Sequence, residues 1–263
     1  MSTPPILLCL VDGMRPDALL QANAPTMQAM LRAGAYSLRA RSVTPSITLP
    51  CITSIFLGVP PQTHETCWNL FNSQNWNAPG LFDALHETGR KTASFYNWEQ
   101  LRDVSRPGSL DISICLNNAE SFDLPLGEGD SILTRLAVSM LASHPVDFAF
   151  VYLGCTDTAG HRHGWMSPEY LSTLENADGC IANLKRALPE SRMIVVADHG
   201  GHETNHGSAE DADMLVPFIA AGSGINPGEI AGPVSLLDIA PSVAALLGLE
   251  APSAWAGRNL FAQ

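Results

Sequence analysis

Short apolar runs that alternate with longer helix-like stretches limit most strongly what this chain can fold into. Five runs are mainly apolar and have the length of one strand: Ile6–Val11, Thr92–Tyr96, Phe148–Leu153, Met193–Ala197 and Pro217–Ala221. Apolar runs without polar alternation are typical of strands covered on both faces. Asp111–Leu116 is a weaker sixth candidate.

Helical patterns occupy the intervals between these runs. They cover Pro25–Ala33, Leu49–Leu57, Ala78–Glu87, Ser131–Ala142, a stretch from Pro168 to about Leu188 with Ser167 as N-cap, and Asp238–Leu247 with Asp238 as N-cap. No repeat or long linker interrupts the pattern. We therefore predict an α/β fold, a three-layer α/β/α sandwich with a mainly parallel central sheet, as a single domain over residues 1–263.

Composition excludes some classes of function. The 263 residues are 46% hydrophobic, which is enough for a buried core, and 14 Lys and Arg against 26 Asp and Glu give a net charge of −12. This balance disfavours a nucleic-acid groove, but a phosphate-bearing substrate stays possible because bound cations can invert the local field. The sequence carries no signal of oligomeric state.

The cysteines and the N-terminus indicate a compartment. Of six cysteines, Cys9, Cys115 and Cys155 lie in or beside strand-like segments, and no C-x-x-C occurs, so we expect buried free thiols in a reducing compartment. The N-terminus lacks a basic region, and Ile6–Val11 is too short for a signal sequence or a membrane span. We expect a cytoplasmic protein without membrane contact.

Three predicted strands are followed by side chains that can bind metals. Asp12 follows the first, Asp157 and His161 follow the third, and Asp198 and His199 follow the fourth. A single aspartate at a strand end usually caps the next helix, but three such ends at the ligand-binding edge of one sheet favour a site.

The donor types and their spacing narrow the choice of metal. Asp157 and His161 are four residues apart, so a helical turn places them on one face. Carboxylate oxygen with imidazole nitrogen suits zinc, and manganese is the alternative. Asp198 and His199 are adjacent, so they can face two metals or one.

Two other segments leave alternatives open. His202 and His206 follow Gly200 and Gly201, which allow a sharp turn, and either histidine can be a ligand or a surface residue. Thr48 precedes the predicted helix Leu49–Leu57, whose N-terminus would favour a phosphoryl group there. The local pattern by itself favours a plain threonine N-cap.

Together these fragments resemble a known family. LVDGMRPD, TPSITLPCITSIFLGVPPQTHE, GCTDTAGHRHG, VVADHGG and HGSAEDADMLVPFIAAG occur in the order of the alkaline phosphatase superfamily, and SLLDIAPSVAALLGL is similar to its last helix. The chain resembles most the nucleotide pyrophosphatase/phosphodiesterase (type I phosphodiesterase) branch, from Leu8 nearly to the C-terminus. This resemblance implies an alkaline-phosphatase-like catalytic core.

The resemblance also implies roles for single residues. Thr48 matches a nucleophile that forms a phospho-enzyme intermediate, and Asn69 matches an asparagine that contacts a phosphoryl oxygen. His206 is favoured over His202 because HG is followed by M-x-x-P-F-I-A-A-G. Two divalent ions, zinc or manganese, are implied. The residues that match the ligands of one ion are Asp12, Thr48, Asp198 and His199. Those that match the ligands of the other ion are Asp157, His161 and His206.

Departures from the family pattern bear on the substrate. Only six residues separate His199 from His206, where eukaryotic-type members carry a longer segment that shapes the nucleotide pocket, so we expect a minimal cap. T-L-P-C cannot supply the formylglycine sequence of sulfatases. The arginines nearest to these motifs are expected to be structural or exposed: Arg15, Arg39 and Arg41.

The expected function is two-metal hydrolysis of a small phosphate ester, with a phosphodiester favoured. A phosphomonoesterase or phosphonate hydrolase is the alternative. A phosphosugar mutase would need a larger cap, and a non-catalytic metal-binding relative would be expected to lose some of the seven metal-site residues. Four aromatic side chains lie near the motifs, and two roles are open for them, stacking on an aromatic leaving group or packing within the fold: Trp68, Phe71, Trp76 and Trp165.

Overall fold

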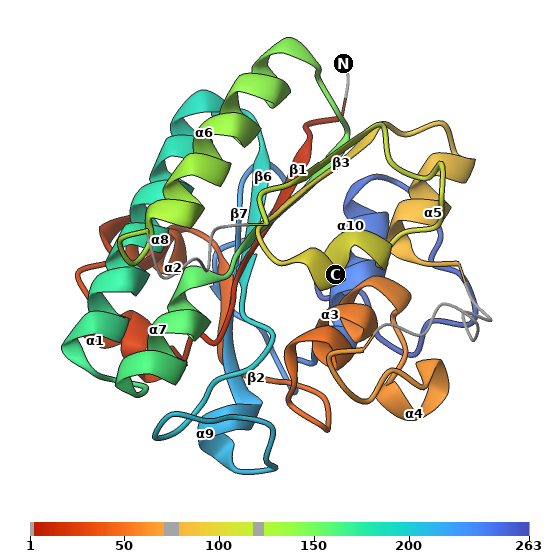
Figure 1. The fold of residues 1–263 in the computed structure, drawn as a ribbon. Coiled ribbons are helices and arrows are strands. Elements are labelled where there is room, and N and C mark those ends of the chain that lie inside the picture. Colours follow the sequence, from red (N-terminus) through yellow and green to blue (C-terminus); the bar gives the residue numbers. More distant parts are fainter. Residues whose placement is uncertain (1–2, 71–78, 118–123, 263) are drawn as a thin grey trace.

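An eight-stranded sheet organises the molecule (Figure 1), a computed structural model that describes residues 3–70, 79–117 and 124–262. The strand order is β4-β3-β5-β1-β6-β7-β2-β8. The strands are β1 Ile6–Val11, β2 Ala35–Arg41, β3 Thr92–Tyr96, β4 Ile112–Cys115, β5 Phe148–Leu153, β6 Arg192–Val196, β7 Leu215–Ala221 and β8 Gly228–Glu229. All neighbouring pairs are parallel except those of β7 with β6 and with β2. The predicted α/β fold with a mainly parallel sheet is confirmed.

Helices cover both faces of the sheet (Figure 1). On one side lie α1 Pro16–Gln21, α2 Pro25–Ala33, α6 Glu128–Ser143, α7 Cys155–His163 and α8 Pro168–Ala187, where α8 contacts the other four. On the other side lie α3 Thr48–Leu57, α4 Pro61–His64, α5 Leu81–Glu87 and α10 Ile239–Leu246. The described residues also form short helical turns: 3₁₀ turns at Glu99–Asp103 and Leu236–Asp238, and α9 Asp211–Met214.

The core fixes the position of α3. Every residue of α3 is buried. Its Phe56 ring stacks on Phe82 of α5 at 4.7 Å between centroids and meets Phe150 of β5 edge-on at 4.9 Å. Because such aromatic contacts in a close-packed core resist movement, the first residue of α3, Thr48, is held rigidly against the sheet.

Some expected elements differ from the structure. β1, β3, β5 and α2 have the expected bounds, whereas β2 and β8 were missed because β2 alternates polar and apolar residues and β8 is two residues long. Asp238 occupies the N-cap position of α10, as expected, but its side chain makes no capping hydrogen bond to that helix. Asp238 already has helical backbone angles, and its carboxylate accepts hydrogen bonds from the N–H groups of Ser235 (2.9 Å) and Arg258 (2.8 Å).

The cysteines form no disulfide; all six lie in the described part of the chain. Cys9, Cys51, Cys155 and Cys180 are buried, as expected for structural thiols. The expected burial is wrong for Cys67 and Cys115, which are exposed; Cys115 lies on β4, an edge strand of the sheet. Among the described helices, none is both long and apolar enough to cross a membrane.

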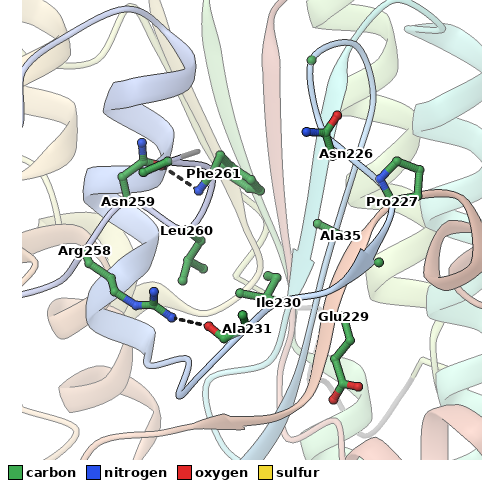
Figure 2. Close-up of a pocket in the computed structure, with 13 residues that line it drawn as sticks. Ala35, Asn226, Pro227, Glu229, Ile230, Ala231, Arg258, Asn259, Leu260 and Phe261 are labelled. Atoms are coloured by element: carbon green, nitrogen blue, oxygen red, sulfur yellow. Dashed lines mark hydrogen bonds between the residues drawn. The ribbon is translucent and has the colours of Figure 1, made fainter.

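A pocket of about 390 Å³ lies where the C-terminal segment meets β8 (Figure 2). The Arg258 guanidinium donates to the carbonyl oxygens of Ala231 (3.0 Å) and Pro233 (2.9 Å), which holds this segment against the sheet edge. None of the predicted metal-site residues lines this pocket.

Candidate metal centre

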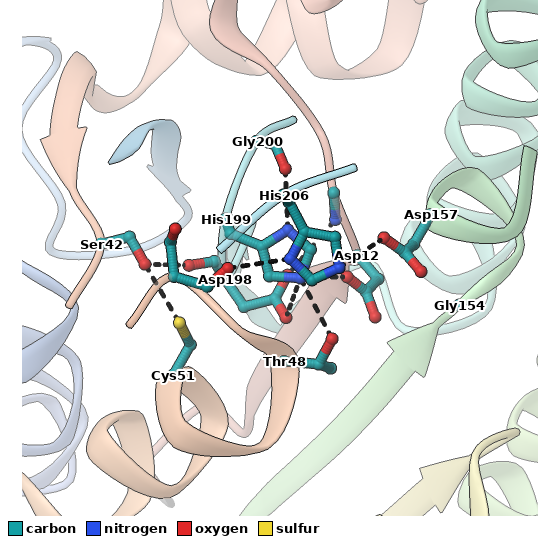
Figure 3. A network of polar contacts seen from close by, with 12 residues as sticks. Asp12, Ser42, Thr48, Cys51, Gly154, Asp157, Asp198, His199, Gly200 and His206 are labelled. Carbon is teal, nitrogen blue, oxygen red and sulfur yellow. Dashed lines mark hydrogen bonds and ion pairs between the residues drawn. The ribbon is translucent and has the colours of Figure 1, made fainter. Parts of the chain in front are cut away.

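The three predicted strand ends meet at one point, because β5, β1 and β6 are adjacent parallel strands. Asp12 directly follows β1, and Asp198 and His199 lie just after β6. Asp157 and His161 lie on α7, which begins two residues after β5. Figure 3 shows Asp12, Asp157, Asp198 and His199 gathered with Thr48 and His206.

The inner group, which we define as Asp12, Thr48, Asp198 and His199, is buried. His199 Nε2 lies at its centre: 3.2 Å from Asp12 Oδ1, 3.4 Å from Asp198 Oδ2 and 3.1 Å from Thr48 Oγ1. Thr48 is the first residue of α3 rather than its N-cap, which is Ile47. The hydroxyl is therefore available to the cluster.

The outer group, which we define as Asp157, His161 and His206, lies beside the inner one and is more open to solvent. Asp157 Oδ2 is 3.4 Å from His161 Nε2, and Asp157 Oδ1 is 3.7 Å from His206 Nε2. The His161 side chain is 43% exposed. The His206 ring stacks on His199 with centroids 3.7 Å apart and planes at 10°, so the two groups are in direct contact.

Each imidazole is oriented by a backbone carbonyl. Nδ1 of His199 bonds Gly200 O (2.8 Å), Nδ1 of His206 bonds Ser46 O (2.9 Å) and Nδ1 of His161 bonds Thr204 O (2.8 Å). A carbonyl only accepts, so Nδ1 carries the proton and Nε2 keeps its lone pair. All three Nε2 atoms are thereby prepared for a cation, as in metal sites whose histidines are fixed by outer hydrogen bonds.

The inner carboxylates are prepared in the same way. The Tyr152 hydroxyl donates to Asp12 Oδ2, and the Gly13 N–H donates to Asp198 Oδ1 at 3.3 Å. The other two oxygens, Asp12 Oδ1 and Asp198 Oδ2, are buried and accept no hydrogen bond from the described residues. Buried polar atoms without a partner are costly and rare, so these two oxygens fit a cation.

Among the described residues, two sets place their ligand atoms within 4.8 Å of one another: Asp12, Asp198 and His199, and Asp157, His199 and His206. The first set agrees with the predicted inner site. The second contains His199 in place of His161, whose Nε2 is 3.4 Å from Asp157 Oδ2 and whose ring centroid is 5.0 Å from that of His206. Carboxylate and imidazole donors at this separation fit two divalent cations.

Burial perturbs the titration of the cluster. It raises the pKa of both Asp12 and Asp198 above the ordinary 3.8, and for Asp12 the neighbouring carboxylates add to the rise. It also lowers the pKa of His199 to about 4 and, with the adjacent His199, that of His206 to about 3. In the metal-free protein both imidazoles are therefore neutral near pH 7, while the buried carboxyls retain protons to higher pH than usual.

Zinc binding is therefore expected to weaken as the pH falls, because zinc competes with protons for Asp12 and Asp198, whereas the lowered pKa values of His199 and His206 keep these two imidazoles neutral. The raised pKa values of Asp12 and Asp198 stabilise the metal-free fold at low pH, and this contribution is lost as the pH rises through those pKa values. The stabilisation of the fold by zinc should therefore grow with pH. Calorimetric titration in buffers of different ionisation enthalpy measures the released protons. Equal affinity at about pH 5 and about pH 8 would contradict this expectation.

The structure distinguishes His206 from His202, between which the local sequence pattern could not choose. His206 lies in the cluster, whereas His202 Nδ1 bonds Asp213 Oδ1 at 2.7 Å outside it. Gly200 and Gly201 are required for lack of space rather than for a sharp turn. A Cβ on Gly200 would lie 2.1 Å from Ala212 O, and one on Gly201 would lie 2.2 Å from Trp165 Cε2.

Asn69 lies next to the nucleophile position. Its Oδ1 accepts the backbone N–H of Leu49 at 3.0 Å, which leaves its amide N–H groups as donors beside Thr48. Trp68 is 69% exposed, and Phe71 and Trp76 lie outside the described residues.

Trp165 is a packing residue of the interior and does not present its ring to solvent. It is buried, its Nε1 donates to Gly13 O at 2.9 Å, and its ring meets His161 edge-on. Arg15 is structural, bonding Gly201 O and Asp17, and Arg39 and Arg41 are exposed.

Sequence reasoning missed Tyr152 and Ser46. Tyr152 lies inside an apolar run and resembles a core aromatic, although a buried tyrosine hydroxyl usually needs a partner, and that need is the signal that could have found it. Ser46 contributes a backbone carbonyl, for which sequence carries no signal.

Comparison with known proteins places this chain in a family. Residues 6–219 match the family model for type I phosphodiesterase/nucleotide pyrophosphatase. Ectonucleotide pyrophosphatase/phosphodiesterase family member 1 of Homo sapiens is 26% identical over 228 residues, 75% of this chain and 24% of that protein. Phosphopentomutase of Methylobacterium sp. (strain 4-46) is 34% identical over 146 residues, 55% of this chain and 31% of that protein. The chain thus spans about a quarter of the ectonucleotide relatives' length.

Solved structures share the fold. An inactive variant of murine ectonucleotide pyrophosphatase/phosphodiesterase 5 in complex with AMP has a TM-score of 0.79 at 14% identity, covering 95% of this chain and 96% of that chain. The phosphonate monoester hydrolase from Silicibacter pomeroyi has a TM-score of 0.74 at 18% identity, covering 98% and 76%. The family match spans most of the chain, and the chain therefore belongs to the type I phosphodiesterase/nucleotide pyrophosphatase family.

Proposed function

We propose that this protein is a two-metal hydrolase of phosphate esters, with phosphodiesters as its main substrates. One observation carries the proposal: the buried oxygens Asp12 Oδ1 and Asp198 Oδ2 lack hydrogen-bond partners among the described residues and lie around the same His199 Nε2 that contacts the Thr48 hydroxyl. Two cation-binding groups beside one buried hydroxyl suit phosphoryl transfer to that hydroxyl.

The residues that would hold the ions follow from the two groups. Asp12, Thr48, Asp198 and His199 would hold one divalent ion, and Asp157, His161 and His206 the other, with zinc preferred and manganese as the alternative. When bound, such ions lower the pKa of a coordinated hydroxyl and stabilise negative charge on the attacking and leaving oxygens. Two divalent cations among three carboxylates make the site net positive, which attracts an anionic ester despite the overall charge of −12.

Thr48 acts as the nucleophile in this proposal. Its Oγ1 forms a bond to phosphorus while the ester bond to the leaving group breaks, the threonine proton passes to water, and the leaving group takes a proton from water and departs as an alcohol. Water then hydrolyses the phosphothreonine, releases the phosphate product and restores the hydroxyl. The inactive variant of the murine relative, a threonine-to-alanine change, supports a catalytic threonine.

The chain also offers donors for the phosphoryl oxygens. The amide N–H groups of Asn69 and the first backbone N–H groups of α3 surround Thr48, and helix N-termini favour anions. These fixed donors would stabilise the charge that develops on the equatorial oxygens in the transition state.

The substrate class is proposed from the relatives and from the short segment between His199 and His206. The murine relative binds AMP, which supports a phosphate ester. Only six residues separate the two histidines, so little chain is available there to enclose a nucleotide. We therefore propose a small diester rather than a specific nucleotide.

Side-by-side hydrolysis of three chromogenic esters tests the proposal. Zinc-loaded protein is expected to cleave bis-p-nitrophenyl phosphate with a higher kcat/KM than p-nitrophenyl phosphate or a phosphonate monoester. A preference for the monoester would instead favour a phosphomonoesterase, and a preference for the phosphonate a phosphonate hydrolase. Protein with two bound ions that cleaves none of the three would overturn the proposed function.

A further inference from the structure

Asp130 is a fully buried carboxylate that belongs to neither group of the candidate centre. It lies near the start of α6, and its Oδ1 accepts a hydrogen bond from Asn97 Nδ2 at 2.6 Å. The backbone N–H of Cys155 lies 3.4 Å from Oδ1 and 3.3 Å from Oδ2. A buried carboxylate is costly unless it accepts such bonds, so its position needs a reason beyond packing.

Asn97 extends this support to the preceding residue. It follows β3, and its Oδ1 accepts the backbone N–H of Gly154 at 3.2 Å. Asp130 and Asn97 thus bind two successive N–H groups at the start of α7, which otherwise have no partner inside the helix. The N-cap of α7 is Gly154, which has no side chain to do this. The two side chains therefore cap α7 from other elements of the fold.

The start of α7 determines where the outer group lies, because Asp157 is in the first turn of α7 and His161 one turn later. The backbone at Gly154, where α7 begins, also has no space for a side chain. A Cβ on Gly154 would be 2.8 Å from Tyr152 Cε1 and 2.9 Å from Asn97 Oδ1. A change in the cap at Gly154 and Cys155 would therefore displace both side chains together.

The inner group is held by different contacts. Its carboxylates are fixed by the Tyr152 hydroxyl and by the Gly13 N–H. Asp130 touches neither of these donors. Different hydrogen bonds thus hold the two groups, although Gly154 lies closely against the Tyr152 ring.

We propose that Asp130 is a positioning residue for the outer group, acting through Asn97 and the start of α7, and that it leaves the inner group unaffected. The inference rests on the proposed function, because it assumes that each group holds one ion. An asparagine at position 130 would replace one acceptor oxygen by an N–H donor. One oxygen would then have to accept the N–H groups of both Asn97 and Cys155, which the carboxylate shares between two oxygens.

Zinc titration of Asp130→Asn against a chromophoric chelator tests the proposal. Wild-type protein is expected to bind two ions. The variant should bind one with wild-type affinity and the other about 10- to 100-fold more weakly, the usual effect of losing an outer support. In a His161→Ala background, which removes an outer ligand, adding Asp130→Asn should leave the affinity of the remaining inner ion unchanged.

Asp83→Asn is the matched control. Asp83 is also buried and accepts the Gly80 N–H at 2.9 Å and the Ser109 hydroxyl, but it caps α5 in the opposite helical layer. It should cost similar folding stability in urea unfolding and leave both zinc affinities unchanged. If Asp130→Asn does not fold, Asn97→Ala makes the same test, since it removes only one acceptor and one donor of the cap.

The outcomes are distinct. Equal weakening of both ions by Asp130→Asn or Asn97→Ala, no weakening of either, or the same pattern in Asp83→Asn overturns the positioning role. A wild-type protein that binds two ions but hydrolyses no ester overturns the proposed function, while a selective loss in the variant still supports the positioning role. A wild-type protein that binds no zinc overturns both.

Discussion

Replacing Thr48 by alanine is expected to reduce kcat by at least about 10⁴-fold, the scale seen when a covalent nucleophile is removed. The hydroxyl at 3.1 Å from His199 Nε2 is the nucleophile of the proposed reaction. Because the other inner residues remain, the variant should still bind two zinc ions. Initial rates with bis-p-nitrophenyl phosphate and zinc content of the same sample measure the two effects together.

Thr53→Ala is the control for this experiment. Thr53 lies on the same helix, five residues after Thr48, and is also buried, but it belongs to neither group and its hydroxyl has no hydrogen-bond partner among the described residues. It should keep wild-type kcat. A Thr48→Ala variant that retains full activity would show that another group attacks the phosphorus.

Replacing His206 by alanine is the second large effect that we expect. His206 Nε2 faces Asp157, and its ring covers His199. Its loss should lower the zinc affinity of one site by at least about 100-fold, because even the loss of outer supports costs 10- to 100-fold. Hydrolysis should fall with it, and metal titration with parallel rate measurements would show both losses.

His202→Ala is the control for His206. His202 is in the same short segment, but 35% of its side chain is exposed and it bonds Asp213 instead. That hydrogen bond raises the pKa of His202, so its loss should affect mainly the local stability of the segment. If His202→Ala lost an ion while His206→Ala kept both, the choice between the two histidines would be wrong.

The fold was largely predictable from the sequence because its central strands are buried on both faces. β1 and β5 are continuous apolar runs, and their bounds follow from that run alone, whereas β3 includes Thr92 and Ser94 but is buried throughout. β2 carries Arg39 and Arg41 on a partly exposed strand, so its pattern does not stand out from a loop. Asp238 lies at the expected N-cap position of α10, but the 3₁₀ turn before that helix uses its carboxylate, which accepts the Ser235 N–H.

The site was predictable where it depends on strand ends. Asp12, Asp157 and Asp198 come together because their strands are neighbours and parallel, which the pattern of elements already implied. Thr48 and His206 needed the family resemblance, because a hydroxyl at a helix start and a histidine in a glycine-rich segment have common structural uses. Tyr152 and Asp130 act through contacts between segments far apart in the chain, which sequence patterns do not encode.

Anomalous diffraction at the zinc absorption edge, from crystals of zinc-reconstituted protein, tests the central claim most directly. The account predicts two peaks about 3.5–4 Å apart. One should be bonded to Asp12, Asp198 and His199, and the other to Asp157 and His206, with His161 turned onto the second ion. No peak at either group, or peaks only at surface histidines, would contradict the proposal of a two-metal hydrolase.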